Sequence, residues 1–198
     1  IYISEPLENN QFITFIKHYD GQYIPLPKPN NKYLGYSLIA CLFGYKYFKK
    51  YEKDIKDLFE LDVDEFVIDT NTVSIHIRRT DYEQNDNQPW YPLSINYYKE
   101  CIKEFNKDTK YTLFSDNIEW CKEIFIKDEM LKNLNIDYID EKIQDYGALI
   151  LMSKCKHNII ANSTFSWWAA YLNKNPSKKV YCPNIWYNET CYINHLDY

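Results

Sequence analysis

The chain has 198 residues and a hydrophobic share of 45%, enough for one domain with a substantial core, or for one domain and part of another. Its formal net charge of −5 at pH 7 argues against a general nucleic-acid-binding protein, although a local basic pocket is compatible with that charge. The 20 tyrosines and 10 phenylalanines predict an unusually aromatic core, and glycine is scarce, with 4 residues.

Cysteine spacing and hydropathy indicate the surroundings of the protein. The six cysteines include no Cys-x-x-C pair and no Cys/His cluster at zinc-ligand spacing, so we expect no metal site and buried thiols in a reducing compartment. No apolar run reaches membrane-spanning length and no signal-peptide pattern opens the sequence, so we expect a cytoplasmic location. Because the sequence starts at Ile1 without a Met, we expect the natural N-terminus to be missing, which is compatible with further domains of a longer polypeptide.

Residues 1–65 predict short strands and turns followed by one helix. Strands are expected at residues 1–4, 12–17 and 23–26. The proline-rich stretch 25–31 interrupts any element there, and apolar residues then recur at helical spacing from Tyr47 to Phe59. The charged segment 61–70 predicts a connection, so we place a domain boundary near residue 65.

From Val73 onward, predicted strands alternate with predicted helices. Strands are expected at residues 73–78, 111–115, 136–139, 157–161 and 179–182. Helices are expected at residues 95–105, 118–125, 144–155 and 163–173, with Ser94 and Asn117 as caps of the first two. Repeated β-α units predict a parallel sheet with helices on both faces, so the fold class is α/β and residues 66–198 form a Rossmann-like domain.

Polar side chains follow three of these strands at the point where each strand ends. They are His76 to Asp81, Ser115 with Asp116, and Asn162 to Ser166. In an open α/β sheet, ligands bind beyond the carboxyl ends of the strands. The hydroxyls of Ser163, Thr164 and Ser166 precede or open a helix, whose N-terminus favours an anion. The shared edge therefore predicts a site for a nucleotide or a nucleotide sugar, with Asp116 placed to hold a base or sugar hydroxyl.

The adjacent arginines Arg78 and Arg79 have two interpretations. A guanidinium presents a planar fork of donors that suits phosphate oxygens, so the pair is predicted to bind a diphosphate without a metal. Taken alone, the same pair fits a surface salt bridge that closes a strand better than it fits a diphosphate site. The hydroxyls and the helix start on the same edge favour the diphosphate.

Other polar residues also have two interpretations. His76 shares a strand face with Arg78, so a role near the phosphates and a packed histidine are equally compatible with its position. Asp145 fits a dipole-stabilising acid at a helix start better than a ligand. Asp62-Val63-Asp64 matches the Asp-x-Asp pattern of metal-dependent glycosyltransferases, but it lies in a charged run and we reject it as a metal site.

Three motifs occur in the order of a known family. They are His76-Ile77-Arg78-Arg79-Thr80-Asp81-Tyr82, Phe114-Ser115-Asp116-Asn117-Ile118-Glu119-Trp120 and Asn162-Ser163-Thr164-Phe165-Ser166-Trp167-Trp168-Ala169-Ala170-Tyr171-Leu172. Together they resemble the α-1,2-fucosyltransferases of glycosyltransferase family 11. The resemblance covers roughly residues 40 to 187, and the length of the third motif makes it specific.

The resemblance implies a two-lobed GT-B enzyme that moves L-fucose from GDP-fucose to a galactose hydroxyl of a glycan, with inversion and without a required metal or other cofactor. Arg78 and Arg79 would hold the pyrophosphate and neutralise the leaving GDP, with His76 alongside. Asp116 and Asp145 resemble acids used toward the nucleotide. Asn162, Ser163, Thr164, Phe165 and Ser166 would line the phosphate or fucose side.

The resemblance leaves the general base and the second lobe open. Asp81, Glu83 and Asp86 are the nearby acids, and Asp86 has a spacing similar to a catalytic acid of related α-1,6 enzymes; a base from the other lobe is an alternative. The Gly-rich strand-turn-helix that opens the family's acceptor lobe has no counterpart here. We therefore expect residues 1–65 to be a reduced or truncated lobe. The alternative function is a GDP-sugar-binding or inactive donor lobe of a larger protein.

Overall fold

The structure is a computed structural model, and it describes residues 2–6, 12–16, 37–39, 49–58, 67–83, 90–140, 142–143 and 145–184. The chain divides into two compact units. One comprises Ile1–Ile55 with Glu189–Tyr198, and the other comprises Lys56–Asn188. The boundary predicted near residue 65 lies outside the described residues.

The first unit contains a small antiparallel sheet. Its strands are β1 (Tyr2–Pro6), β2 (Phe12–Ile16) and β3 (Ser37–Ile39), in the order β2-β1-β3. The first two strands confirm the prediction to within two residues, whereas the strand expected at 23–26 lies outside the described residues. A short 3-10 helix η2 (Lys49–Tyr51) leads into α1 (Glu52–Leu58), within the stretch predicted as helical.

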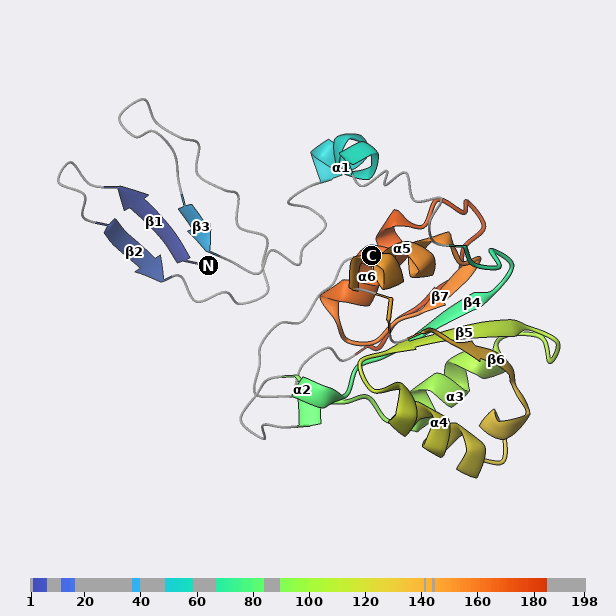
Figure 1. Cartoon of the computed structure of the whole chain (residues 1–198). Helices are drawn as coiled ribbons and strands as arrows, with labels where there is room; N and C mark the ends of the chain where they lie inside the picture. The colour runs from blue at the N-terminus through green and yellow to red at the C-terminus, as the bar shows by residue number, and fades with distance from the viewer. Residues whose placement is uncertain are drawn as a thin grey trace. The chain divides into compact units, whose positions relative to one another are not determined.

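The second unit is built on a five-stranded parallel sheet (Figure 1). Its strands are β4 (Val73–Ile77), β5 (Lys110–Ser115), β6 (Asn135–Tyr138), β7 (His157–Ile159) and β8 (Val180–Tyr181). Its helices are α2 (Thr80–Glu83), α3 (Ile95–Lys103), α4 (Ile118–Lys127), the 3-10 helix η3 (Leu131–Asn133), α5 (Asp145–Lys154) and α6 (Thr164–Leu172). The predicted α/β class and parallel sheet are confirmed.

The strand order is β6-β5-β4-β7-β8. The chain proceeds outward from β4 through β5 to β6, and then returns to the other side of β4 for β7 and β8. The helices that follow β4 and β7, α3 and α6, lie on opposite faces of the sheet, so the carboxyl ends of these two strands form a switch point of the kind at which open α/β sheets bind ligands. Residues that follow these two strands are placed at this switch point.

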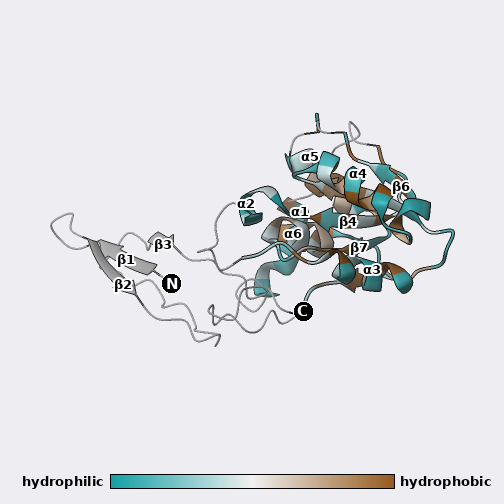
Figure 2. Cartoon of the chain, turned by 90° about the horizontal axis from the view of Figure 1, so that it is seen from below, coloured by the Kyte–Doolittle hydropathy of each residue, from teal (hydrophilic) through white to brown (hydrophobic). Residues whose placement is uncertain are grey.

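Helices cover both faces of this sheet, with α3 and α4 on one face and α5 and α6 on the other (Figure 1). Val73, Ile75 and Ile77 are fully buried in the cluster that includes residues of α3 and α4. Phe114 belongs to a second cluster with residues of α5 and α6. Side chains alternate between the faces of a strand, so odd-numbered β4 residues face α3 and α4 and even-numbered ones face α5 and α6. The exposed residues of α3 and α4 are mostly hydrophilic (Figure 2).

A buried polar network joins the sheet to α5 and α6. Asn158 donates through its Nδ2 to the Ser74 hydroxyl and to the Met152 carbonyl, both at 2.8 Å. Asn173 donates to Asn158 Oδ1 and to the Cys155 carbonyl, both at 2.7 Å. Both buried side-chain amides thus have hydrogen-bond partners, and these partners lie on the sheet and on the two helices. The network therefore fixes how α5 and α6 lie on the sheet.

Candidate functional site

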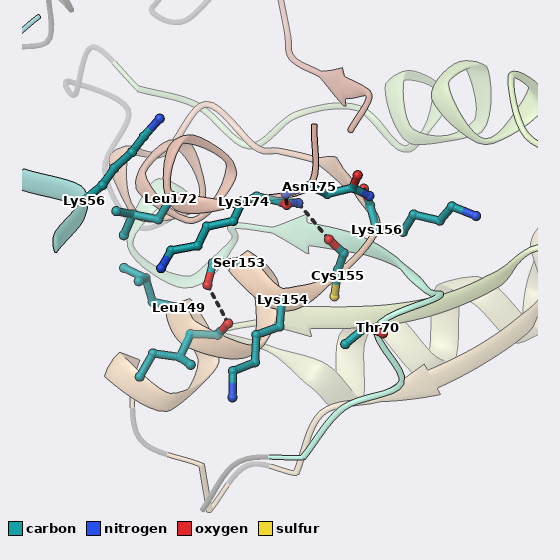
Figure 3. A pocket seen from close by; sticks show the side chains of 12 residues that line it. Lys56, Thr70, Leu149, Ser153, Lys154, Cys155, Lys156, Leu172, Lys174 and Asn175 are labelled. Carbon is teal, nitrogen blue, oxygen red and sulfur yellow. Dashed lines mark hydrogen bonds between the residues drawn. The ribbon is translucent and has the colours of Figure 1, made fainter. Parts of the chain in front are cut away.

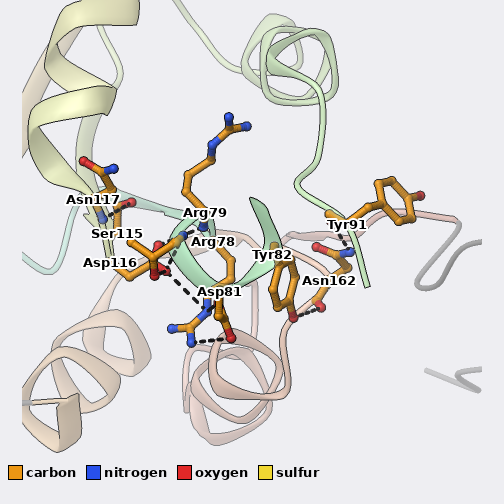
Figure 4. A network of polar contacts seen from close by, with 10 residues as sticks. Arg78, Arg79, Asp81, Tyr82, Tyr91, Ser115, Asp116, Asn117 and Asn162 are labelled. Carbon is orange, nitrogen blue, oxygen red and sulfur yellow. Dashed lines mark hydrogen bonds and ion pairs between the residues drawn. The ribbon is translucent and has the colours of Figure 1, made fainter. Parts of the chain in front are cut away.

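The two adjacent arginines lie at the end of β4, but their guanidinium groups point in opposite directions (Figure 4). The alternation of β4 continues through them: Arg78 follows the parity of His76, and Arg79 follows that of Ile77. The structure therefore does not bring Arg78 and Arg79 together as one diphosphate-binding pair. Each has a separate set of partners.

Arg78 has acidic partners and remains partly open to solvent. Its Nε and Nη2 donate to the two carboxylate oxygens of Asp81 at 2.8 and 3.0 Å, and Nε lies 3.5 Å from Asp116 Oδ2. Its side chain is 33% exposed, and the Tyr82 ring lies beside it. Burial alone would lower the Arg78 pKa, but the hydrogen bond that Arg78 donates to Asp81 and the charges of Asp81 and Asp116 raise it. The salt bridge expected as the alternative interpretation is thus present within one short segment.

Arg79 is packed between side chains of α2 and α4. Its guanidinium carbon lies 3.9 Å from the centre of the Trp120 ring, and it forms an ion pair with Glu83. Its side chain is 15% exposed, and burial lowers its pKa. Its Nε has no hydrogen-bond partner within the described residues. These contacts give Arg79 a packing role in this structure.

Asp116 holds the segment that carries both arginines. Its Oδ1 accepts the Arg79 amide at 2.9 Å, and its Oδ2 accepts the Thr80 amide at 3.0 Å and the Thr80 hydroxyl at 2.5 Å. Burial would raise its pKa, but the hydrogen bonds from Thr80 and Arg79 and the charge of Arg78 lower it. Asp116 is therefore an ionised acid whose oxygens are occupied by the protein.

His76 is buried on the same face as Arg78. It is 3% exposed, its ring lies 5.6 Å from that of Phe165, and its Nδ1 has no hydrogen-bond partner among the described residues. Burial lowers its pKa to about 4, although the Asp116 carboxylate acts in the opposite direction. At neutral pH the imidazole is uncharged and could still offer one nitrogen to a ligand.

The segment after β7 reaches the same edge. Tyr82 donates its hydroxyl to the Asn162 carbonyl at 2.9 Å, and Asn162 donates its Nδ2 to the Tyr91 carbonyl at 2.9 Å (Figure 4). The end of β7 is thereby tied to both sides of the segment that follows β4. The predicted approach of these two motifs is present in the fold.

The five residues predicted to line the phosphate or fucose differ in exposure. Thr164 is exposed and Phe165 is half-buried, so both can face a ligand. Asn162 and Ser163 are buried, although Ser163 precedes the first turn of α6. Ser166 is fully buried and its hydroxyl donates to the Ser163 carbonyl, so in this structure it packs α6 and does not reach an open site.

The remaining predicted acids have different positions. Asp145 is exposed in the first turn of α5, on a different part of the carboxyl edge from Arg78. Asp81 and Glu83 each pair with one arginine. Asp86 lies outside the described residues.

Residue-type reasoning missed three contributors: Thr80, Tyr82 and Trp120. Thr80 and Tyr82 alternate with charged residues in the first motif, and Trp120 ends the second. A threonine that opens a helix and a tryptophan one turn after an N-cap asparagine were the available signals. Their partners are distant in sequence, which hides the contacts.

Two pockets lie at the amino ends of the parallel strands, on the opposite side of the sheet from the carboxyl ends that carry Arg78 and Asp116. One, of about 460 Å³, is lined by the last turns of α5 and α6 and by residues that precede β4 and β7, including Thr70, Ser153, Lys156 and Asn175 (Figure 3). Another, of about 400 Å³, includes Asn71, Phe105 and His157. Neither is lined by Arg78, Asp116 or Thr164, so they are separate from the candidate site.

Three further features concern only the residues that the structure describes. No group of three or more His, Cys, Asp or Glu side chains there is arranged to hold a metal ion. None of the helices there combines the length and the apolarity needed to cross a membrane. The four cysteines in those residues are free thiols, and three of them are buried as expected.

A family model described as glycosyl transferase family 11 matches residues 5–193 of this chain. The chain belongs to this family. The resemblance seen in its three motifs is thus confirmed at the level of the family, and the match begins at residue 5, whereas the resemblance began near residue 40.

This family 11 chain is similar to several curated proteins. The Escherichia coli O-antigen biosynthesis glycosyltransferase WbnK is 36% identical over 59% of this chain and 39% of its own length. The Escherichia coli alpha-1,2-colitosyltransferase is 34% identical over 72% of this chain and 53% of its own length. The galactoside alpha-(1,2)-fucosyltransferase 1 of Saimiri boliviensis boliviensis is 30% identical over 50% of this chain and 28% of its own length.

The family 11 chain therefore spans about half, or less, of the length of these curated relatives. Among solved structures, this chain is similar to POFUT1 in complex with GDP-fucose. The match covers 67% of this chain and 47% of the POFUT1 chain, with a TM-score of 0.40 and 19% identity.

Proposed function

We propose that this family 11 chain is the donor-binding part of a glycosyltransferase that moves L-fucose from GDP-fucose to a galactose hydroxyl of a glycan. The bond formed would be an α-1,2 linkage, made with inversion at the sugar and without a required metal. Family membership supports glycosyl transfer, and the relatives named for α-1,2 transfer support the linkage.

The observation that carries the proposal is the position of Arg78. It lies at the carboxyl end of β4, beside β7, where the strand order changes direction, and it is partly open to solvent. When the bond between fucose and GDP breaks, negative charge develops on the diphosphate. A guanidinium fixed at that point stabilises the departing charge most in a site from which water is excluded. Arg78 is thus the residue that would bind and neutralise the leaving group.

Other residues of the same edge would complete the donor site. Thr164 and Phe165 open α6, the helix that follows β7; Thr164 is exposed and Phe165 is half-buried. The first-turn amides of this helix favour an anion, which fits a second phosphate. His76 would offer a neutral imidazole beside the diphosphate.

The acceptor hydroxyl must lose its proton to a base. Among the described acids of this edge, Asp81 is the most exposed one that touches Arg78, with a side chain 50% accessible to solvent. We assign it as the candidate base, with Asp86 and an acid from another part of the polypeptide as the alternatives.

A second donor sugar has specific support. The relative that this chain matches over 72% of its residues is named for colitosyl transfer, whereas the primate relatives are named for fucosyl transfer. Both names include the α-1,2 linkage. GDP-colitose is therefore the alternative donor.

The length of the relatives supports a second role for this chain. Because it spans about half of their length, a unit that binds a GDP sugar but needs further polypeptide for transfer is the alternative to a complete enzyme. In that arrangement, residues 66–198 would be the donor lobe of a GT-B enzyme and residues 1–65 a reduced acceptor lobe.

The test is to incubate the protein with GDP-fucose or GDP-colitose and a galactose-terminated oligosaccharide, and to measure GDP release. The linkage of the product is determined by NMR. Arg78→Ala and Arg78→Lys form the control pair, since lysine keeps the charge and loses the fork. Binding of GDP without turnover would favour the donor-binding unit. Absence of both turnover and binding of any GDP sugar would overturn the proposal.

A further inference from the structure

We propose that Asp116 is a positioning residue that acts on the donor phosphates through Arg78, and that it does not bind the nucleoside. This inference rests on the proposed function, because it requires a diphosphate beside Arg78. It differs from the expectation that the acid after the second strand of the sheet holds a base or a sugar hydroxyl.

The oxygens of Asp116 are already occupied. A carboxylate has about four lone-pair positions. Three receive hydrogen bonds from the Arg79 amide, the Thr80 amide and the Thr80 hydroxyl, at distances between 2.5 and 3.0 Å. Oδ2 takes both Thr80 donors and also lies 3.5 Å from the Arg78 Nε, whereas Oδ1 takes the Arg79 amide. A ribose or guanine donor would find Oδ2 fully occupied, and only one lone pair of Oδ1 is left for it on a side chain that is 16% exposed.

The contacts of Asp116 fix the backbone that carries Arg78. Asp116 follows β5, and Ile77 pairs with Ser115 in the neighbouring strand. Its carboxylate reaches across to two consecutive amides just after Arg78, at the start of α2. Because these bonds are made to the main chain, they hold the turn whatever side chain occupies position 78. The direction in which Arg78 leaves β4 depends on them.

The low solvent exposure of Asp116 strengthens its hydrogen bonds to the segment that follows Arg78. Its side chain is 16% exposed, so the hydrogen bonds are shielded from water. Asp81, in contrast, is half exposed and binds only the guanidinium. Asp116 therefore orients the segment, while Asp81 touches only the end of the Arg78 side chain.

A double-mutant cycle with GDP as the ligand tests the inference. We expect Asp116→Asn to weaken GDP binding by about tenfold, since an amide cannot accept all of these donors and places its own N–H groups against them. Arg78→Ala should weaken it by a similar factor. If Asp116 acts through Arg78, the double variant should bind GDP no more weakly than Arg78→Ala alone. Calorimetry measures the three affinities.

A milder substitution keeps the inference testable if the Asp116→Asn variant does not fold. Thr80→Val removes one hydrogen bond to Asp116 and adds no group near a ligand, so it should weaken GDP binding severalfold in the wild-type background and have no effect in the Arg78→Ala background. Thr80→Ser keeps the hydroxyl and should bind GDP as the wild type does. Asp137→Asn, an exposed acid of β6 paired with Lys110, is the charge-matched control and should leave GDP affinity unchanged.

The outcomes separate this inference from the proposed function. If the wild type binds GDP and the losses from Asp116→Asn and Arg78→Ala add in full, Asp116 contacts the ligand directly and the inference is overturned while the proposed function stands. If the wild type binds neither GDP nor GDP-fucose, the proposed function fails, and this inference fails with it. Non-additive losses, together with the contrast between Thr80→Val and Thr80→Ser, would establish the positioning role.

Discussion

Arg78 and Asp81 are joined by two nearly parallel hydrogen bonds, from Nε to Oδ1 at 2.8 Å and from Nη2 to Oδ2 at 3.0 Å. The carboxylate occupies the same forked edge of the guanidinium that a phosphate would use. It is also half exposed, which makes it easier to displace than Asp116. A diphosphate that binds Arg78 by this edge must therefore compete with Asp81.

The first prediction follows from that competition. Arg78 and Arg79 contribute two positive charges at the end of β4, and Asp81, Glu83 and Asp116 contribute three negative ones. Asp81→Asn removes the competing charge and should raise GDP affinity by up to about fivefold, because an exposed ion pair is worth about 1 kcal/mol or less. The gain should shrink in high salt. Calorimetry at two salt concentrations measures it.

Glu83→Gln is the matched control for Asp81→Asn, since it removes the same formal charge from the partner of Arg79. An equal gain of GDP affinity in both variants would indicate a general change of the electrostatic potential, and not the removal of a specific competitor. A loss of affinity in Asp81→Asn would mean that Asp81 orients Arg78 for the phosphate instead of competing with it.

The second prediction concerns His76 and pH. Its folded-state pKa of about 4 lies below the ordinary 6.5, so the unfolded chain binds the proton more readily. The associated stability is fully present above pH 6.5 and is lost as the pH falls toward 4. The difference of about 2.5 pKa units corresponds to roughly 3 kcal/mol of unfolding free energy. Urea unfolding of wild type and His76→Gln between pH 7 and 4 measures it, and the stability difference between the two proteins should narrow or reverse over that window. Parallel curves for the two proteins would contradict the prediction.

The third prediction concerns the contact between Arg79 and Trp120. Trp120→Leu should destabilise the fold by about 1 kcal/mol beyond the loss of buried area, because the guanidinium loses its aromatic partner. Trp120→Phe keeps a ring face and should lose less. In an Arg79→Met background the two Trp120 variants should differ little. Chemical unfolding gives all of these values, and an unchanged gap between Leu and Phe in that background would refute a specific contact.

The fourth prediction tests the buried amides between β7 and α6. Asn173→Ala removes the amide that donates to the fully buried Oδ1 of Asn158, and should cost about 2–3 kcal/mol of stability. Asn133→Ala removes one exposed hydrogen bond to a carbonyl and should change stability by less than about 0.5 kcal/mol. Thermal unfolding compares the two, and similar losses would argue against a special contribution of the network.

The sequence was sufficient to predict the β-α alternation and its parallel sheet, because apolar periodicity and capping residues such as Ser94 and Asn117 are local signals. The order of the strands was not accessible in this way, since the same alternation is compatible with several orders. The four-residue helix α2 was missed for a related reason: Asp116, 36 residues from Thr80, supplies the hydrogen bonds that hold its start.

The candidate site was predicted in outline from the shared sheet edge. Its internal roles depended on contacts that residue types do not reveal. The residue type alone does not distinguish an aspartate that accepts main-chain amides from an aspartate that binds a nucleotide. The contacts of Asp116 with two main-chain amides were therefore visible only in the structure. The separation of Arg78 from Arg79 was, by contrast, implicit in the two-residue period of β4, although the doublet suggested a joint function.

That separation means that the doublet offers no redundancy. The two-residue period of the strand directs each arginine to one side of the sheet, Arg78 to the side of His76 and Arg79 to the side of Trp120. Insertion or deletion of one residue in β4 would place each arginine on the side of the sheet that the other now occupies. It would also turn the buried Ile75 and Ile77 toward the opposite face. The spacing between the hydrophobic strand and its first arginine is therefore as restricted as the identity of the arginine itself.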